Sequence, residues 1–63
     1  MSSLTDLSST ERVIVDALRD GPKHIDELGL TTHLTSSVLN ATVTILEIGG
    51  IIRDSGGKVY VLR

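Results

Sequence analysis

The feature that most constrains the fold of this chain is a pair of glycines between a helical pattern and two short β-forming runs. Gly49 and Gly50 stop the helical pattern. The runs that follow, Ile51–Arg53 and Val59–Leu62, are rich in β-branched and aliphatic residues, and Ser55–Gly57 between them has the composition of a hairpin turn. The chain is therefore expected to close with a helix that leads directly into a small β-hairpin.

A first helix is expected near the start of the chain. Ser8 and Glu11 have the spacing of a capping box, in which each side chain accepts a hydrogen bond from the other residue's backbone N–H. The helical pattern then runs to about Arg19. Asp20–Pro22 ends it, because glycine supplies a helix-terminating turn and proline cannot continue a helix.

Two further helices are expected before the hairpin. Lys23–Ile25 is extended and can supply a short first strand, and a second helix covers about Ile25–Thr31. Thr35 is a favourable N-cap for a third helix that runs to about Ile48. Gly29 costs a helix about 1 kcal/mol relative to alanine, so we expect it to mark a close crossing with the third helix.

These elements predict a mainly α (α+β) fold, a winged helix-turn-helix with three helices and a C-terminal hairpin wing. We expect residues 1–7 to form a flexible lead-in and residues 8–63 to form one domain. A chain of 63 residues can hold one small core and no deep active-site cavity. The sequence has no run of about 20 apolar residues, no signal-peptide pattern and no cysteine, and a cytoplasmic location is expected.

The third helix has a polar arc, defined by its positions on a helical wheel. Its members are Ser36, Ser37, Asn40 and Thr44, with Glu47 at the end. The four uncharged residues can donate hydrogen bonds to phosphates, and Asn40 has the groups that pair with adenine. The arc has no Arg or Lys, and Glu47 would repel phosphate. Two interpretations remain open: a face that contacts nucleic acid, and an ordinary solvated face.

The same helix has two apolar stripes. The first, Leu39, Val43 and Leu46, is expected to form the seam with the other helices. The second, called the apolar stripe below, consists of Val38, Ala41, Ile45 and Ile48. It exceeds what a small domain needs for its core. It can contact the hairpin and the first helix, or it can be a protein-interface or dimer surface.

Positive charge lies mainly in or beside the hairpin. Lys58 and Arg53 are the residues expected to hold a phosphate from the edge of a groove, and ordinary surface solvation is the alternative. Asp54 and Lys58 flank the turn and are expected to pair across it. The net charge of −2 argues against strong, salt-driven DNA binding by this domain alone.

The residues do not indicate catalysis, a metal site or a cofactor. His24, Asp26 and Glu27 match no compact metal motif, and His33 has no partner nearby in the sequence. We expect His24 to cap a helix or lie on the surface. His33 falls at a helix-helix turn, where histidine tolerates a left-handed backbone better than most residues. No Ser or Thr has a convincing base and orienting partner, so the chain is not expected to be an enzyme.

The combined pattern resembles the C-terminal winged-helix domain of the bacterial DNA-processing protein A family (DprA/Smf). The matching segments are Gly21–Pro22, Ile25–Leu28, Leu34–Thr35, Leu46–Ile52 and Gly56–Tyr60. The helix end followed by the Gly-Gly-x-x-Tyr hairpin is the most specific part. The resemblance covers about residues 10–62. The family often has alanine at the position of Gly29, glycine at that of His33, and serine or threonine at that of His24.

This resemblance implies a role in natural transformation. The family binds incoming single-stranded DNA and helps to load the RecA recombinase, mainly through a Rossmann-like domain that this sequence lacks. The chain would then be an accessory domain, either trimmed from a larger parent chain or a stand-alone relative. Its expected partners are DNA, bound weakly through the backbone, a RecA-type recombinase, the rest of a parent chain, or a second copy in a homodimer.

Three functions are thus in competition. The first is an accessory domain that binds DNA weakly through the wing and the polar arc. The second is a protein-interaction or dimerisation module that uses the apolar stripe without direct DNA contact. The third is a sequence-specific repressor, which needs a dimer and two half-sites and would depend almost entirely on Asn40, Ser36 and Ser37 for specificity.

Overall fold

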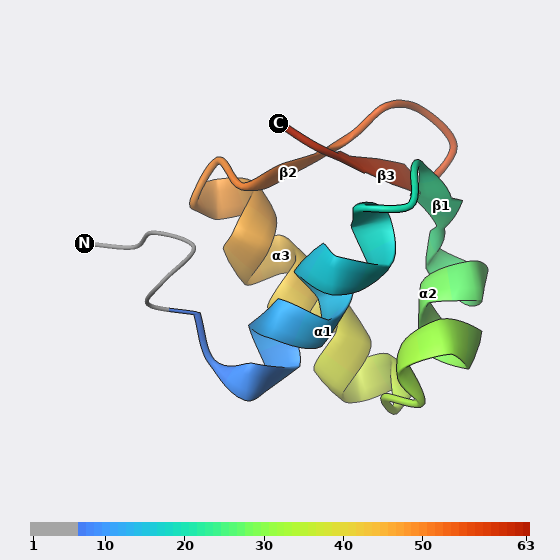
Figure 1. The fold of residues 1–63 in the computed structure, drawn as a ribbon, viewed down its shortest axis with the longest axis vertical. Coiled ribbons are helices and arrows are strands. Elements are labelled where there is room, and N and C mark those ends of the chain that lie inside the picture. Colours follow the sequence, from blue (N-terminus) through green and yellow to red (C-terminus); the bar gives the residue numbers. More distant parts are fainter. Residues whose placement is uncertain (1–6) are drawn as a thin grey trace.

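The computed structural model describes residues 7–63 and contains three helices and a small three-stranded sheet (Figure 1). The elements in chain order are α1 (Ser9–Leu18), β1 (Lys23–His24), α2 (Ile25–Thr32), α3 (Ser36–Ile48), β2 (Ile52–Asp54) and β3 (Val59–Leu62). The predicted winged-helix architecture is confirmed. The expected lead-in lies outside the described residues except for Leu7, which is 9% exposed and packs in the core.

Side-chain caps set the beginnings of α1 and α3, as the sequence predicted. The Glu11 backbone N–H donates to Ser8 Oγ at 3.2 Å, and the Ser8 N–H donates to Glu11 Oε1 at 2.8 Å. At α3, the Val38 N–H donates to Thr35 Oγ1 at 3.3 Å. Each bond satisfies a backbone group that has no partner within its own helix, which fixes where the helix begins.

Two histidines define the ends of α2. The Asp26 N–H donates to His24 Nδ1 at 3.0 Å, and the His24 N–H donates to Glu27 Oε1 at 3.2 Å. His33 ends the helix in the left-handed conformation with φ of 61°. Both expectations for these residues are confirmed. The helix extends to Thr32, one residue beyond the predicted end.

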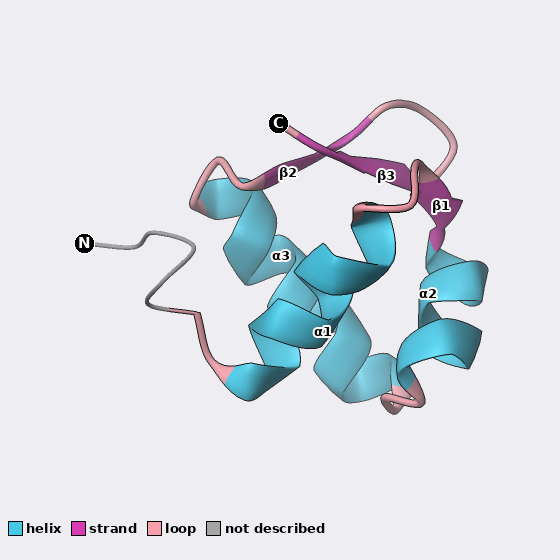
Figure 2. Cartoon of the chain, viewed as in Figure 1, coloured by secondary structure: helices cyan, strands magenta, loops and turns pink. Residues whose placement is uncertain are grey.

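The strands form one antiparallel sheet in the order β1-β3-β2, at one end of the helical cluster (Figure 2). β2 begins and ends one residue later than predicted. The expected pairing of Asp54 with Lys58 is wrong. Asp54 lies opposite Tyr60 in the sheet, and its Oδ1 accepts a hydrogen bond from the Gly56 N–H at 2.7 Å. The Asp54 carboxylate therefore bonds to the backbone of the hairpin turn and not to Lys58.

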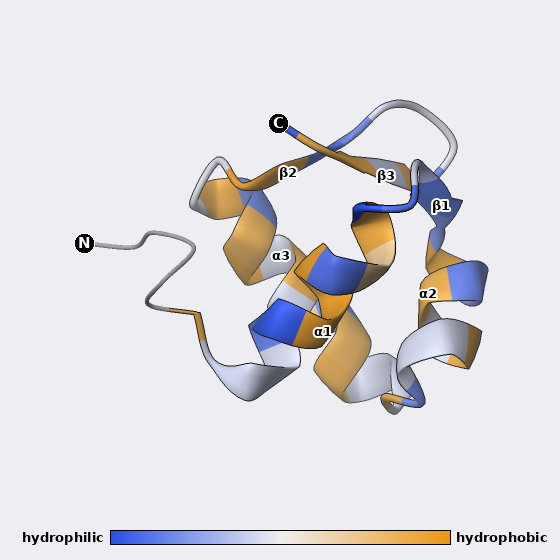
Figure 3. Cartoon of the chain, in the orientation of Figure 1, coloured by the Kyte–Doolittle hydropathy of each residue, from blue (hydrophilic) through white to orange (hydrophobic). Residues whose placement is uncertain are grey.

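The core lies where the three helices and β2 meet. Its largest fully buried side chains are Ile14, Val15, Leu28, Leu46 and Ile52, and orange apolar segments of the helices face this centre in Figure 3. In residues 7–63 no helix is long and apolar enough to cross a membrane. The same residues contain no group of three or more His, Asp or Glu that could hold a metal ion.

Gly29 lies at the contact between α2 and α3, but the crossing does not require glycine. A Cβ added at this position would lie 3.5 Å from Leu39 Cδ2, which is ordinary van der Waals contact. Gly29 thus marks a contact with the third helix, as expected, but an alanine would also fit there. Leu39 leaves enough space for one methyl group.

Candidate nucleic-acid interface

The polar arc of α3 faces solvent. Ser36, Ser37, Asn40 and Thr44 are all exposed. The Thr44 hydroxyl donates to the Asn40 carbonyl oxygen at 2.9 Å, so its proton is already used within the helix. Ser36 and Asn40 lie nearer the beginning of α3, and they are the arc residues that can reach the adjoining helix and strand.

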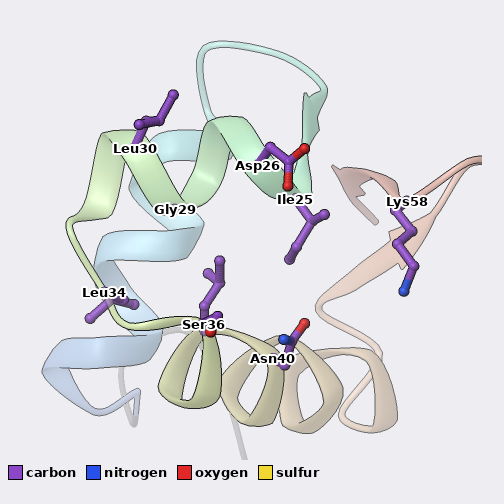
Figure 4. A pocket seen from close by; sticks show the side chains of 9 residues that line it. Ile25, Asp26, Gly29, Leu30, Leu34, Ser36, Asn40 and Lys58 are labelled. Carbon is purple, nitrogen blue, oxygen red and sulfur yellow. The ribbon is translucent and has the colours of Figure 1, made fainter.

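An open groove of about 550 Å³ lies between α2, the first turns of α3 and the start of β3 (Figure 4). Its apolar lining consists of Ile25, Gly29, Leu30, Leu34 and Leu39, and its polar residues are Asp26, Ser36, Asn40 and Lys58. The groove brings together Ser36, Asn40 and Lys58 of the six residues predicted to contact nucleic acid. Ser37, Thr44 and Arg53 do not line it.

A backbone hydrogen bond to α2 holds Lys58 beside the groove. Its carbonyl oxygen accepts a hydrogen bond from the Ile25 N–H at 2.9 Å, which holds the start of β3 beside the start of α2. The residue adopts a left-handed backbone with φ of 63°. Its side chain and that of Asn40 point into the same opening below Ile25 in Figure 4. Within residues 7–63 Lys58 forms no ion pair, so its charge is available to a ligand.

Arg53 lies elsewhere on the sheet. It is exposed on β2 and pairs with Val61, whereas the groove adjoins the opposite edge of the sheet, where β1 pairs with β3. The two hairpin cations therefore belong to different parts of the surface. Of the described residues that line the groove, Lys58 alone carries a positive charge.

Acidic groups limit how much phosphate this surface can attract. Asp26 lies on the rim of the groove, and its Oδ2 is 3.6 Å from His24 Nδ1. At the other end of α3, burial raises the pKa of Tyr60, and the carboxylates of Glu47 and Asp54 raise it further. These acids place negative potential beside the hairpin. Asp26 directly follows Ile25, whose N–H is bonded to the Lys58 carbonyl oxygen, so its carboxylate weakens the attraction of the nearby lysine for phosphate.

The apolar stripe is exposed along its whole length. Val38 is 43% exposed, Ile45 57% and Ile48 82%, and Ala41 is also exposed. The stripe is therefore not part of the core, and any contact with α1 and the hairpin covers only part of it. Thr42 beside it is buried, with its hydroxyl donating to the Val38 carbonyl oxygen at 2.7 Å.

The apolar lining of the groove was not predicted from the sequence. Leu30, which lines the groove, is 77% exposed, whereas Leu28 is the one fully buried residue of the same short helix. Eight residues give too few turns for a hydrophobic period to separate a core position from a groove position. The one signal available in the sequence was a second leucine, Leu30, two residues after Leu28 in so short a helix.

One comparison with known proteins gives a match. A family model described as the DprA winged helix domain matches residues 2–58. No match was found among curated proteins or among solved structures.

Proposed function

The chain belongs to the DprA winged helix domain family, and from this premise we propose that it is an accessory domain that binds the DNA backbone weakly and without sequence specificity. The proposed setting is DNA processing during natural transformation, beside a RecA-type recombinase or the rest of a larger parent chain. The domain contributes a docking surface and no catalytic group.

The observation that carries this proposal is the convergence of Lys58, Asn40 and Ser36 on one groove. An ammonium, an amide and a hydroxyl all donate hydrogen bonds, and all suit phosphate and sugar oxygens. The three come from a strand start and the first turns of α3. The positive end of the α3 dipole lies at Ser36, at the end of the groove away from Lys58 (Figure 4), and favours an anion there.

The charge of the groove sets the expected strength of DNA binding. One phosphate neutralised by Lys58 predicts a slope of about −1 in a plot of log affinity against log salt. Binding through so few contacts is expected at the weak end of the non-specific range, with a Kd on the order of 0.1 mM. α3 has no Arg or Lys for bidentate recognition of guanine. The proposal assigns Asn40 to the DNA backbone rather than to adenine, so it includes no sequence-specific readout.

Fluorescence anisotropy of a labelled DNA duplex and of its single strand tests this proposal. We expect both to bind, with affinity falling between about 50 and 200 mM salt. Lys58→Glu is expected to abolish binding. Arg53→Glu is the matched control, because it makes the same change of charge at another exposed hairpin residue outside the groove.

The comparison of the two variants distinguishes DNA binding at the groove from a general effect of net charge. Binding lost in Lys58→Glu and largely kept in Arg53→Glu supports the groove. An equal loss in both variants would mean that net charge rather than the groove controls binding. No loss in Lys58→Glu, with the fold intact by circular dichroism, would overturn the proposal.

A second candidate function is protein binding through the apolar stripe. The exposure of Ile45 and Ile48 favours it, because a small domain has no structural need for two aliphatic side chains in water. Ile45→Glu should leave the domain folded and abolish any association. If the variant unfolds, Ile45 contributes to the core and this candidate fails.

A further inference from the structure

The spacing of the apolar stripe is the same in both directions along α3. From Val38 the stripe advances by three residues to Ala41, by four to Ile45 and by three to Ile48. Two copies of α3 placed antiparallel, with a two-fold axis on the exposed face at the height of residue 43 along the helix, therefore bring Val38 opposite Ile48 of the second copy. The same axis brings Ala41 opposite Ile45. We infer that the apolar stripe binds a second copy of this chain in this arrangement.

The side chains fit such a pair. Each large Ile45 meets a small Ala41, so the helices can approach closely at the centre, while Val38 and Ile48 fill the two ends. Steps of three and four residues produce the seam of a left-handed helix pair, in which side chains of one helix fit between those of the other. All four residues are exposed in the single chain, so no other element has to move first.

The charges on α3 also favour self-pairing. Glu47 is the helix's sole ionisable residue, and it lies on the polar arc with Asn40, away from the stripe. Ser37 and Thr44, the arc residues nearest the stripe, are uncharged. α3 itself therefore brings no like charge to the seam. The stripe has no charge that would select a different partner, whereas a two-fold pair needs only a self-complementary surface.

The pair is expected to be weak. Four residues on each side compare with roughly 20–30 a side in a standard interface, so the expected Kd is on the order of 0.1–1 mM. This inference rests on the second candidate function, that the stripe is a protein-binding surface, and names its occupant. It does not depend on DNA binding by the groove.

Disulfide cross-linking tests the register, because the natural chain has no cysteine. Val38→Cys and Ile48→Cys chains, one isotope-labelled, are mixed at about 1 mM in a glutathione buffer, a concentration at or above the expected Kd. The predicted pair aligns these two positions across the seam. Two Val38→Cys chains would instead be offset by ten residues, or about 15 Å along the axis, beyond the roughly 7 Å between Cα atoms that a disulfide allows.

We expect the mixed disulfide, which joins a Val38→Cys chain to an Ile48→Cys chain, to exceed the disulfide between two Val38→Cys chains about tenfold or more. Val13→Cys is the matched control for random encounter, because it replaces an α1 valine of almost equal exposure, 41% against 43% for Val38. If two Val38→Cys chains gave the dominant product, the helices would pair in parallel and the inference would be overturned. Mixed cross-linking no higher than in the control would also overturn it.

Ile45→Glu in the Val38→Cys and Ile48→Cys chains separates self-pairing from binding of other proteins by the stripe. A folded variant that loses the mixed disulfide supports self-pairing. A folded variant that cross-links at the original level overturns self-pairing, while the stripe remains exposed to other proteins. A variant that unfolds overturns both, because the stripe would then belong to the core.

Discussion

Replacing Gly29 with alanine should stabilise this domain, although glycine lies where two helices touch. Glycine in the interior of a helix costs about 1 kcal/mol relative to alanine. The new Cβ would lie 3.5 Å from Leu39 Cδ2, so it gains a contact without displacing one. We therefore expect Gly29→Ala to raise the free energy of unfolding by about 0.5–1 kcal/mol. In a domain of this size, about 1 kcal/mol corresponds to a rise in Tm of roughly 4–8 °C.

Thermal and urea unfolding followed by circular dichroism measure this change. Gly50→Ala is the control, because its φ of 74° disfavours any side chain although no atom lies within 4 Å of the added Cβ. It should lower stability by about 1 kcal/mol through backbone strain alone. A lower Tm for Gly29→Ala would contradict this prediction, because it would show that the α2–α3 contact is too tight for a methyl group.

Three further predictions concern stability. Ser8→Ala removes the hydrogen bond from the Glu11 N–H and should cost about 0.5–2 kcal/mol by urea unfolding, whereas no change would mean that water replaces the cap. Leu28→Ala creates a cavity at a fully buried position and should lower the free energy of unfolding by about 2–5 kcal/mol. Circular dichroism should then show much of the protein unfolded. Full stability would contradict the placement of Leu28 in the core. Tyr60 has a raised pKa, so the stability that its protonated form contributes is complete below pH about 10 and is lost as pH rises through the folded-state pKa. Tyr60→Phe should flatten that alkaline loss in urea titrations, and an unchanged pH profile would assign the loss to other groups.

The helices and strands could be predicted from interactions between residues that are close in the sequence. Ser8 and Thr35 accept hydrogen bonds from N–H groups three residues ahead, so their caps are visible in the sequence. His33 adopts the left-handed turn at a position where histidine is tolerated. Gly50, with positive φ, ends α3 where the pattern changes from helix to strand. Local chemistry of this kind requires no knowledge of the tertiary structure.

The candidate site was less predictable because it depends on a contact between distant segments. The hydrogen bond from the Ile25 N–H to the Lys58 carbonyl oxygen joins α2 to the start of β3 and directs the lysine to the groove. No local pattern encodes that approach. Lys58 was therefore predicted to act together with Arg53, its neighbour in the hairpin, whereas only Lys58 lines the groove. The wrong Asp54–Lys58 pair has a local origin instead, because the Gly56 N–H, two residues further along the chain, donates to the Asp54 carboxylate.

The groove and the apolar stripe occupy different sides of α3, so the two proposed activities can reinforce each other. Lys58 and Asn40 point into the groove beside α2, while Ile45 and Ile48 face water. A pair formed through the stripe would present two grooves, and the second groove would bind at a high effective concentration.

This coupling gives a prediction for salt dependence. Well above the Kd of the pair, two Lys58 contacts should steepen the slope of log affinity against log salt from about −1 to about −2. Ile45→Glu leaves the groove residues intact and should return the slope to about −1 at every protein concentration. Anisotropy titrations of a DNA duplex over a range of protein concentrations measure this. A slope that is the same in both proteins would show that any pair binds DNA through one groove at a time, because the counterions released on binding would then come from a single lysine.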